Sequence, residues 1–286
     1  MKHIRLTLII LLAFNALSAQ KKIEIPETSA VNWFVKRLPE QLERFHFKDL
    51  KSSKDSLNIR IWKRHEIFNL SCNNTFSSEF IIRTGGTDFV STSHKFGEDI
   101  SKALLTSFDA NNMHKLKDDS FRGIDGSFIY IEIATKNKYK VVSYWSPSSD
   151  RSEDCKSLLQ FLDDMHQAVN SKELYNTFLN SLPVGGYSWG MSSLRIERFL
   201  DDKAEKTDFY VMAERKIKRK LNIGKKTDHW KYPALIINHK PAKFDELNKY
   251  TKEDVVKFEI LKPNNPQTSL YGTNGARGVI RVETKQ

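Results

Sequence analysis

The sequence predicts an α+β protein, in which an antiparallel sheet with flanking helices is followed by a smaller module of short strands and helices. The first observation is a hairpin pattern at 127–145, where two runs rich in β-branched and aromatic residues enclose a polar turn. The second is a set of apolar stripes at helical spacing on both sides of that hairpin. The third is a group of short apolar strands within 232–286.

The N-terminus has the pattern of a secretory signal peptide. Lys2 and Arg5 precede the apolar run Leu6 to Phe14, which is too short to span a bilayer. Leu17 and Ala19 follow at the two positions that a signal peptidase reads, and both are residues that it accepts there. We therefore expect a signal peptide at 1–19 with cleavage after Ala19. The mature chain is then exported and lies in the periplasm or associates with the outer membrane.

The first predicted domain spans 20–205 and begins with a helix. An apolar stripe predicts this helix at 28–45, with Thr28 or Ser29 as its N-cap and an interruption near Pro39. Strand patterns follow at 57–70 and 76–84, and Leu57, Ile59 and Ile61 alternate with polar residues as in a sheet with one buried face. A Gly-Gly turn at 85–86 separates them from a helix at 97–109.

Two further helices follow the hairpin. Asp150 and Glu153 have the spacing of a capping box and predict a helix that continues to Val169. Asn170 and Glu173 have the same spacing and predict the next helix, which ends before Pro183. Asp-Gly at 125–126 and Tyr-Trp-Ser-Pro at 144–147 resemble features of exported proteins of unknown function from Bacteroidetes-type bacteria, and this resemblance implies no activity.

The second predicted domain spans 206–286. Strands are predicted at 234–237, 255–262 and 279–283, with a turn through Lys240-Pro241 and a single helical turn opened by Thr251 and Asp254. A short helix is expected at 266–271, with Gly272 as its C-cap.

This order of elements resembles the plug domain of TonB-dependent outer-membrane receptors of the Bacteroidetes type. The residues that carry the resemblance are Leu261, Lys262, Tyr271, Gly272, Gly275 and Gly278, together with Val279-Ile280 and Thr284-Lys285. The chain departs from the family pattern at Asn238-His239, where Asp-Gly is usual, and at 263–266. Residues 26–31 are a poor match to a TonB box, and no barrel follows within this sequence. We therefore do not expect transport.

The three glycines of this motif invite a comparison with a phosphate-binding loop. Such a loop follows a strand and opens a helix, whereas Gly272, Gly275 and Gly278 precede a strand. We interpret them as structural residues that permit tight turns with positive φ.

The formal net charge is +11, and the densest basic cluster is Arg215, Lys216, Lys218, Arg219 and Lys220. Export argues against nucleic acid as the partner, so the expected partner is an envelope protein or an anionic envelope component. The positive charge of the chain would attract it by long-range electrostatics, without recognition of a particular sequence. Peripheral contact with the outer membrane fits this expectation. The alternative is a solvated helix face with Ile217 and Leu221 turned inward. The sequence does not indicate an oligomeric state.

No pattern in the chain indicates a cofactor, a metal site or a catalytic group. The eight histidines include no His-Glu-x-x-His pair, and His65-Glu66 lacks a second histidine four residues on. Cys72 and Cys155 either form a disulfide in the oxidising compartment or stay apart as thiols. We expect a non-enzymatic binding module. The alternatives are a periplasmic hydrolase with a site in the N-terminal domain and an accessory of a separately encoded TonB-dependent receptor.

Overall fold

The computed structural model describes residues 21–86 and 89–285, and it has the predicted α+β class. Within these residues the chain divides into two compact units. The first unit covers 21–81 and 93–169, and the second covers 82–92 and 170–285. The predicted signal peptide lies outside the described residues. No helix in the described part has both the length and the apolar character that crossing a membrane requires.

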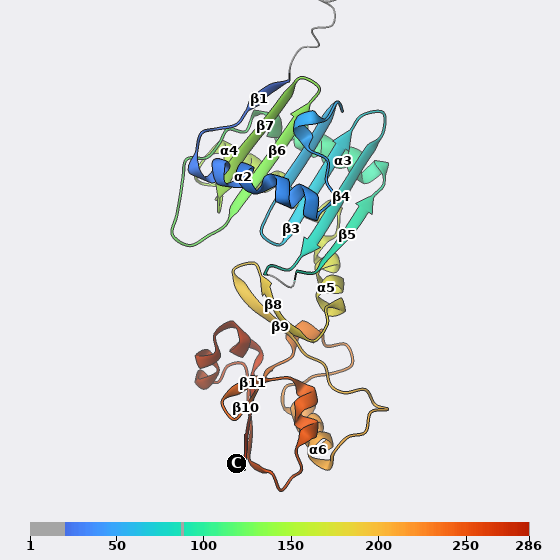
Figure 1. Cartoon of the computed structure of the whole chain (residues 1–286), viewed down its shortest axis with the longest axis vertical. Coiled ribbons are helices and arrows are strands. Elements are labelled where there is room, and N and C mark those ends of the chain that lie inside the picture. The colour runs from blue at the N-terminus through green and yellow to red at the C-terminus, as the bar shows by residue number, and fades with distance from the viewer. Residues whose placement is uncertain (1–20, 87–88, 286) are drawn as a thin grey trace, which may run out of the picture. The chain divides into compact units, whose positions relative to one another are not determined.

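The first unit contains a seven-stranded sheet in the order β1-β7-β6-β2-β3-β4-β5 (Figure 1). The pairs β2–β3, β2–β6 and β6–β7 are antiparallel, while the short edge strand β1 runs parallel to β7. The strands are β1 Lys22–Glu24, β2 Leu57–Trp62, β3 Glu66–Cys72, β4 Phe76–Arg83, β5 Ser91–Phe96, β6 Phe128–Thr135 and β7 Lys138–Trp145.

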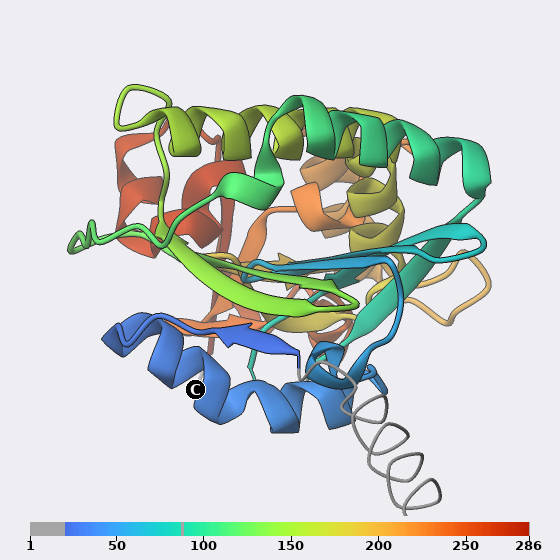
Figure 2. The same ribbon diagram turned by 90° about the horizontal axis from the view of Figure 1, so that it is seen from above.

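Helices cover both faces of this sheet. Figure 2 shows α2 (blue) on one face, and α3 and α4 (green) on the opposite face. The helices of this unit are α2 Ser29–Arg44, η1 Leu50–Ser52, α3 Glu98–Ala110, η2 Met113–Lys115 and α4 Glu153–Ala168. Because both faces are covered, the polar residues that alternate along β2 are buried as well: Asn58 is 6% and Arg60 is 4% exposed. The expectation of a single buried face was therefore wrong.

Helix α2 forms from an N-cap and an apolar stripe. The Thr28 hydroxyl accepts a hydrogen bond from the amide of Val31, as an N-cap does. Val31, Phe34 and Leu38 are buried against the sheet. The predicted interruption at Pro39 is absent, and the helix continues to Arg44. Burial of the stripe on both sides of the proline offsets the one backbone hydrogen bond that proline cannot donate.

The hairpin at 127–145 is confirmed as β6 and β7, whereas the predicted strand 57–70 is two strands, β2 and β3, joined by a turn. The N-cap of α4 is Ser152 and not Asp150, because the Ser152 hydroxyl accepts the amide of Cys155. Asn170 is the N-cap residue of the next helix as predicted, but its side chain bonds to Glu173 instead of capping.

The second unit contains a four-stranded sheet in the order β11-β10-β13-β12. Strands β10 and β13 are parallel, and the two outer pairs are antiparallel. A separate hairpin, β8–β9, precedes them. The elements are α5 Ser171–Ser181, β8 Gly185–Trp189, β9 Ser192–Ile196, α6 Asp208–Lys220, η3 His229–Lys231, β10 Ala234–Ile237, β11 Lys240–Ala242, η4 Phe244–Lys249, β12 Val255–Leu261, η5 Pro266–Arg277 and β13 Val279–Thr284.

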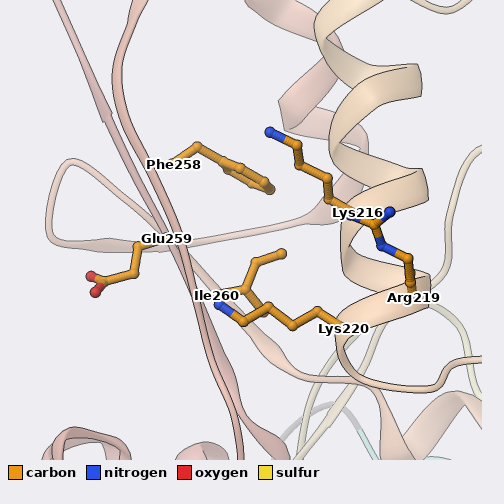
Figure 3. A pocket seen from close by; sticks show the side chains of 6 residues that line it. All are labelled: Lys216, Arg219, Lys220, Phe258, Glu259 and Ile260. Carbon is orange, nitrogen blue, oxygen red and sulfur yellow. The ribbon is translucent and has the colours of Figure 1, made fainter.

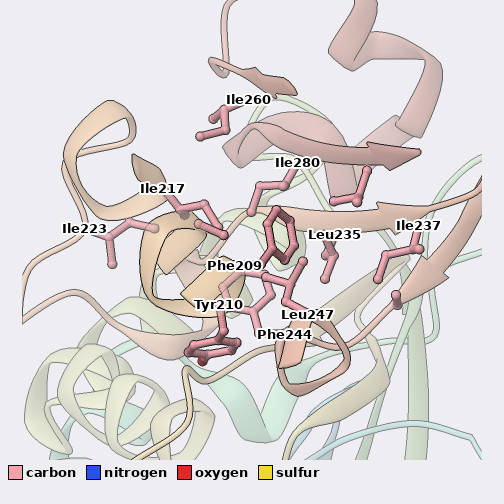
Figure 4. Packing of buried hydrophobic residues seen from close by; sticks show 13 residues of the cluster. Phe209, Tyr210, Ile217, Ile223, Leu235, Ile237, Phe244, Leu247, Ile260 and Ile280 are labelled. Atoms are coloured by element: carbon pink, nitrogen blue, oxygen red, sulfur yellow. The ribbon is translucent and has the colours of Figure 1, made fainter. Parts of the chain in front are cut away.

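One face of the four-stranded sheet forms the core of the second unit (Figure 4). Leu235, Ile280 and Val282 project from the strands toward Phe209 and Ile217 of α6, and all are buried. Neighbouring residues of β13 alternate between the two faces, so Val279 joins a small cluster on the other side. The predicted two-faced pattern of the last strand is therefore confirmed.

The main segment of the second unit begins at Asn170, whereas the sequence suggested a boundary near 205. Residues 170–205 pack with the C-terminal part of the chain. The Asn180 side chain donates to Asp228 and accepts the amide of His229, and Glu197 accepts the amide of Phe244. These long-range bonds join segments 47 to 49 positions apart, which no local pattern reveals.

The turn between β10 and β11 is formed by Asn238 and His239, which have φ angles of 47° and 65°. The predicted turn through Lys240-Pro241 was two residues late, because Lys240–Ala242 is strand β11. Two successive residues with positive φ are typical of a tight hairpin turn, where glycine is favoured at the second position. The Asn-His pair that departs from the family pattern thus occupies this turn.

The predicted helical turn at 251–254 is a hydrogen-bonded turn without a helix. The Asp254 carboxylate accepts the amide and the hydroxyl of Thr251, at 2.7 and 2.8 Å, and β12 begins at the next residue.

Candidate functional site

The glycines of the plug-like motif have structural roles. Gly272 and Gly278 have φ angles of 55° and 94°, as the sequence interpretation predicted. Gly275 is required for another reason, since a Cβ there would lie 2.0 Å from the carbonyl oxygen of Thr268. Nothing in these three positions forms a phosphate-binding loop at the start of a helix.

The other motif residues lie beside these glycines. Leu261 ends β12 and forms a small buried cluster with Ile236 and Val279. Tyr271 packs against this cluster. Lys262 is exposed in the turn after β12, where its carbonyl accepts the amide of Asn265. The motif therefore covers the face of the four-stranded sheet that is opposite to the core with α6.

The predicted basic cluster lies on the outer face of α6. Phe209, Tyr210, Ala213 and Ile217 form the inner face and are buried, while Arg215, Lys216, Arg219 and Lys220 are exposed. Leu221, the C-cap residue, packs against the core, as the sequence predicted. Cations in the last turn of a helix also interact favourably with its dipole.

Lys218 differs from its neighbours because it is held in an ion pair. Its Nζ pairs with the Glu214 carboxylate and lies 4.8 Å from the centroid of the Phe199 ring. Glu214 also pairs with Lys206 at 3.1 Å. Lys218 therefore belongs to the packing of the helix, and it does not line the groove that three of its neighbours form with β12.

Three of the other cations of α6 line a groove between α6 and β12 (Figure 3). Lys216, Arg219 and Lys220 contribute the helix side, and the cavity has a volume of about 390 Å³. On the strand side, Phe258 and Ile260 point toward the helix and give the groove an apolar floor, as Figure 3 shows. Arg215 is on the same helix but does not line the groove.

The one acidic residue of the groove wall is turned away from it. Glu259 points to the opposite side of β12 (Figure 3), where its carboxylate lies 3.4 Å from Arg281 and 3.6 Å from Lys257. Among the described residues, no ion pair involves Lys216, Arg219 or Lys220. The groove therefore combines three uncompensated positive charges with an apolar floor, which is the chemistry that holds an anion attached to an apolar group.

Cys72 and Cys155 are free cysteines in this structure. Cys72 ends β3 and is half-buried, while Cys155 lies in the first turn of α4 and is fully buried. Of the two alternatives that the sequence left open, the structure contains separate thiols.

A charged cluster surrounds Glu66 in the first unit, and no sequence pattern indicated it. This carboxylate, at the start of β3, is 1% exposed and forms ion pairs with Lys63 and with His166 of α4, the latter at 3.4 Å. His65 Nε2 lies 4.0 Å from the other carboxylate oxygen. Residue 166 is far from 66 in sequence, so no spacing rule could find this cluster.

Burial raises the pKa of Glu66, but hydrogen bonds and charges from His166 and Lys63 outweigh it and hold the pKa at about 2. A carboxylate with so low a pKa is a weak proton acceptor. Its role is to hold the ammonium group of Lys63 and the imidazole of His166 in place. Among the described residues, no group of three or more His, Cys, Asp or Glu side chains could hold a metal ion.

Glu66→Gln is expected to lower the free energy of unfolding by about 2 kcal/mol at pH 7, because Lys63 and His166 lose a buried carboxylate partner. Since the folded pKa lies below the unfolded value of 4.5, the stabilisation is present above 4.5 and is lost as the pH falls toward 2. Denaturant unfolding between pH 6 and pH 3 tests this. A difference between the two proteins that stays constant over this range contradicts the assignment. Glu153→Gln, at an exposed position, is the matched control.

The chain matches no protein-family model and no curated protein.

Proposed function

We propose that this chain is an exported, non-enzymatic envelope protein whose plug-like second unit binds an anionic lipid surface. The binding site is the groove of Lys216, Arg219 and Lys220 over Phe258 and Ile260. The observation that carries the proposal is the presence of three cations without ion-pair partners, in the described part of the chain, beside apolar side chains.

The physical argument starts from the charges. Each Lys or Arg close to an anionic bilayer contributes about 1 kcal/mol of attraction. The apolar floor can contact the glycerol or acyl part of a lipid next to its phosphate. A free inorganic anion has no apolar part and would not gain from this contact. The basic balance of the chain adds a long-range field of the same sign, because the formal net charge of +11 is still +9 when Lys2 and Arg5 are removed with the signal peptide. The predicted signal peptide and the plug-like motif support an envelope location.

The test is binding of the purified protein to vesicles of phosphatidylglycerol and phosphatidylcholine, measured by co-sedimentation. We expect Lys216→Gln, Arg219→Gln and Lys220→Gln together to weaken binding by about a hundredfold, because three contributions of about 1 kcal/mol are lost.

The matched control removes the same net charge elsewhere on the second unit. Lys225, Lys226 and Lys240 are exposed and form no ion pair among the described residues, so their triple replacement by Gln leaves the groove intact. A general charge effect reduces binding equally in both triple variants. That outcome, or binding to vesicles without phosphatidylglycerol, would overturn the proposal.

A further inference from the structure

The first unit has a second groove, independent of the basic groove of the second unit. It has a volume of about 380 Å³ and lies where α2 meets β6. A cavity of this size suits a small ligand or one or two units of a polymer. Its lining is Ser29, Ala30, Trp33, Arg122, Phe128 and Tyr130, with no acidic side chain among them.

Most of the aromatic rings in this wall are already packed on one another. Phe34 stacks on Tyr130 at 4.4 Å, and Tyr130 stacks on Phe128 at 5.3 Å, measured between ring centroids. Trp33 is different, because it is 55% exposed. The guanidinium of Arg37 lies over its ring, 5.0 Å from the centroid, and the rest of the exposed indole offers a flat apolar surface beside the groove.

Arg122 is held in place at the edge of this groove. One of its terminal nitrogens donates to the backbone oxygens of Asp119 and Phe121, at 2.5 and 2.6 Å, and its guanidinium lies 5.1 Å from the Phe128 ring centroid. No ion pair involves Arg122 among the described residues. Its remaining N–H groups are therefore available to a carboxylate, which guanidinium binds in a fixed planar geometry.

Two glycines allow the loop that carries Arg122 to approach the sheet. A Cβ at Gly123 would lie 2.6 Å from Nε1 of Trp145, and one at Gly126 would lie 2.3 Å from the hydroxyl of Ser146. Trp145 in turn packs edge-on against Phe128 at 4.7 Å. The arginine is thus pre-positioned by the loop, which reduces the entropy lost when a ligand binds.

We propose that this groove binds an acidic glycan, with a sugar ring on Trp33 and the carboxylate of that ring on Arg122. The C–H face of a sugar ring is flat and apolar and fits an exposed indole. The ring hydroxyls find donors and acceptors in Ser29 and Tyr130. The absence of acidic side chains from the lining makes the site complementary to a negative charge.

The test uses three probes with the purified protein: digalacturonic acid, the corresponding neutral digalactoside and N-acetylphenylalanine. Binding is followed through the indole N–H signals in NMR spectra, where the signal that disappears in Trp33→Ala identifies the reporter. We expect digalacturonic acid to shift this signal at millimolar concentration, and the neutral disaccharide to bind about tenfold more weakly.

Two variants complete the experiment. Arg122→Gln should weaken the binding of digalacturonic acid by about tenfold and leave the binding of the neutral disaccharide unchanged. Arg44→Gln, on the same unit, should change the affinity for neither probe. A Trp33 signal that does not respond overturns the proposal. So does tighter binding of N-acetylphenylalanine, which would assign the groove to aromatic carboxylates. Because this groove is in the first unit, the outcome is separate from vesicle binding by α6.

Discussion

Replacement of Gly275 by alanine is expected to lower the free energy of unfolding of the second unit by about 3 kcal/mol, at the upper end of the usual cost of overpacking. The added Cβ would lie 2.0 Å from the carbonyl oxygen of Thr268 and 2.9 Å from its carbon. Both are backbone atoms, and Thr268 is fixed by bonds from its hydroxyl to the carbonyls of Pro263 and Asn265. Thr268 and Gly275 both belong to η5, so the clash can be relieved only by distorting the backbone of η5 itself.

Gly224→Ala is the matched control for this prediction, since it adds the same methyl group in the same unit with no atom within 4 Å. Its unfolding free energy should change little. Urea unfolding followed by circular dichroism compares the two. Equal stabilities for both variants would contradict the close approach of Gly275 to Thr268.

The second large effect is expected at Glu132, a fully buried carboxylate on β6. Its oxygens accept from Trp62 Nε1 at 2.7 Å, from the Tyr139 hydroxyl at 2.8 Å and from Arg60 at 3.5 Å. Burial raises the pKa of Glu132, and the charge of Arg60 and the two hydrogen bonds oppose this rise. Glu132→Ala leaves the buried guanidinium without a carboxylate, which we expect to cost about 4 kcal/mol of stability.

The coupling between Arg60 and Glu132 can be separated from simple loss of packing. The double variant Arg60→Leu with Glu132→Leu removes both charges, so its destabilisation should be clearly smaller than the sum of the two single changes. Glu40→Ala, on the exposed side of α2, should stay within about 0.5 kcal/mol of the parent protein. Additive single effects would contradict a coupled buried pair. Equilibrium unfolding in urea compares the parent protein with Arg60→Leu, Glu132→Leu, the double variant and Glu40→Ala.

Local patterns predicted much of this fold. The hairpin β6–β7, the helices α2 and α3 and the strands β10, β12 and β13 all follow from periodicity, and Thr28 was recognised as a cap. These features depend on neighbours within a few positions, where the chemistry of single residues decides the backbone. The positive φ of Gly272 and Gly278 was predictable for the same reason.

Features that depend on distant pairs could not be predicted. Glu66 meets His166 across one hundred positions, and Glu132 meets Arg60 across 72. For the basic groove, the sequence identified the cations of α6 but not Phe258 and Ile260, which only the packing of β12 beside the helix provides. It also could not distinguish Lys218, which is held in an ion pair, from its neighbours, because that pairing depends on Glu214 and Phe199.

Binding of an anionic head group in the groove between α6 and β12 can be tested directly by an NMR titration of the purified protein. The titration uses dihexanoyl phosphatidylglycerol, kept below its micelle concentration, and zwitterionic dihexanoyl phosphatidylcholine. We expect amide shifts that centre on Lys216–Lys220 and Phe258–Ile260 with the anionic lipid alone. Shifts that are equal for both lipids, or that centre elsewhere on the chain, would contradict it.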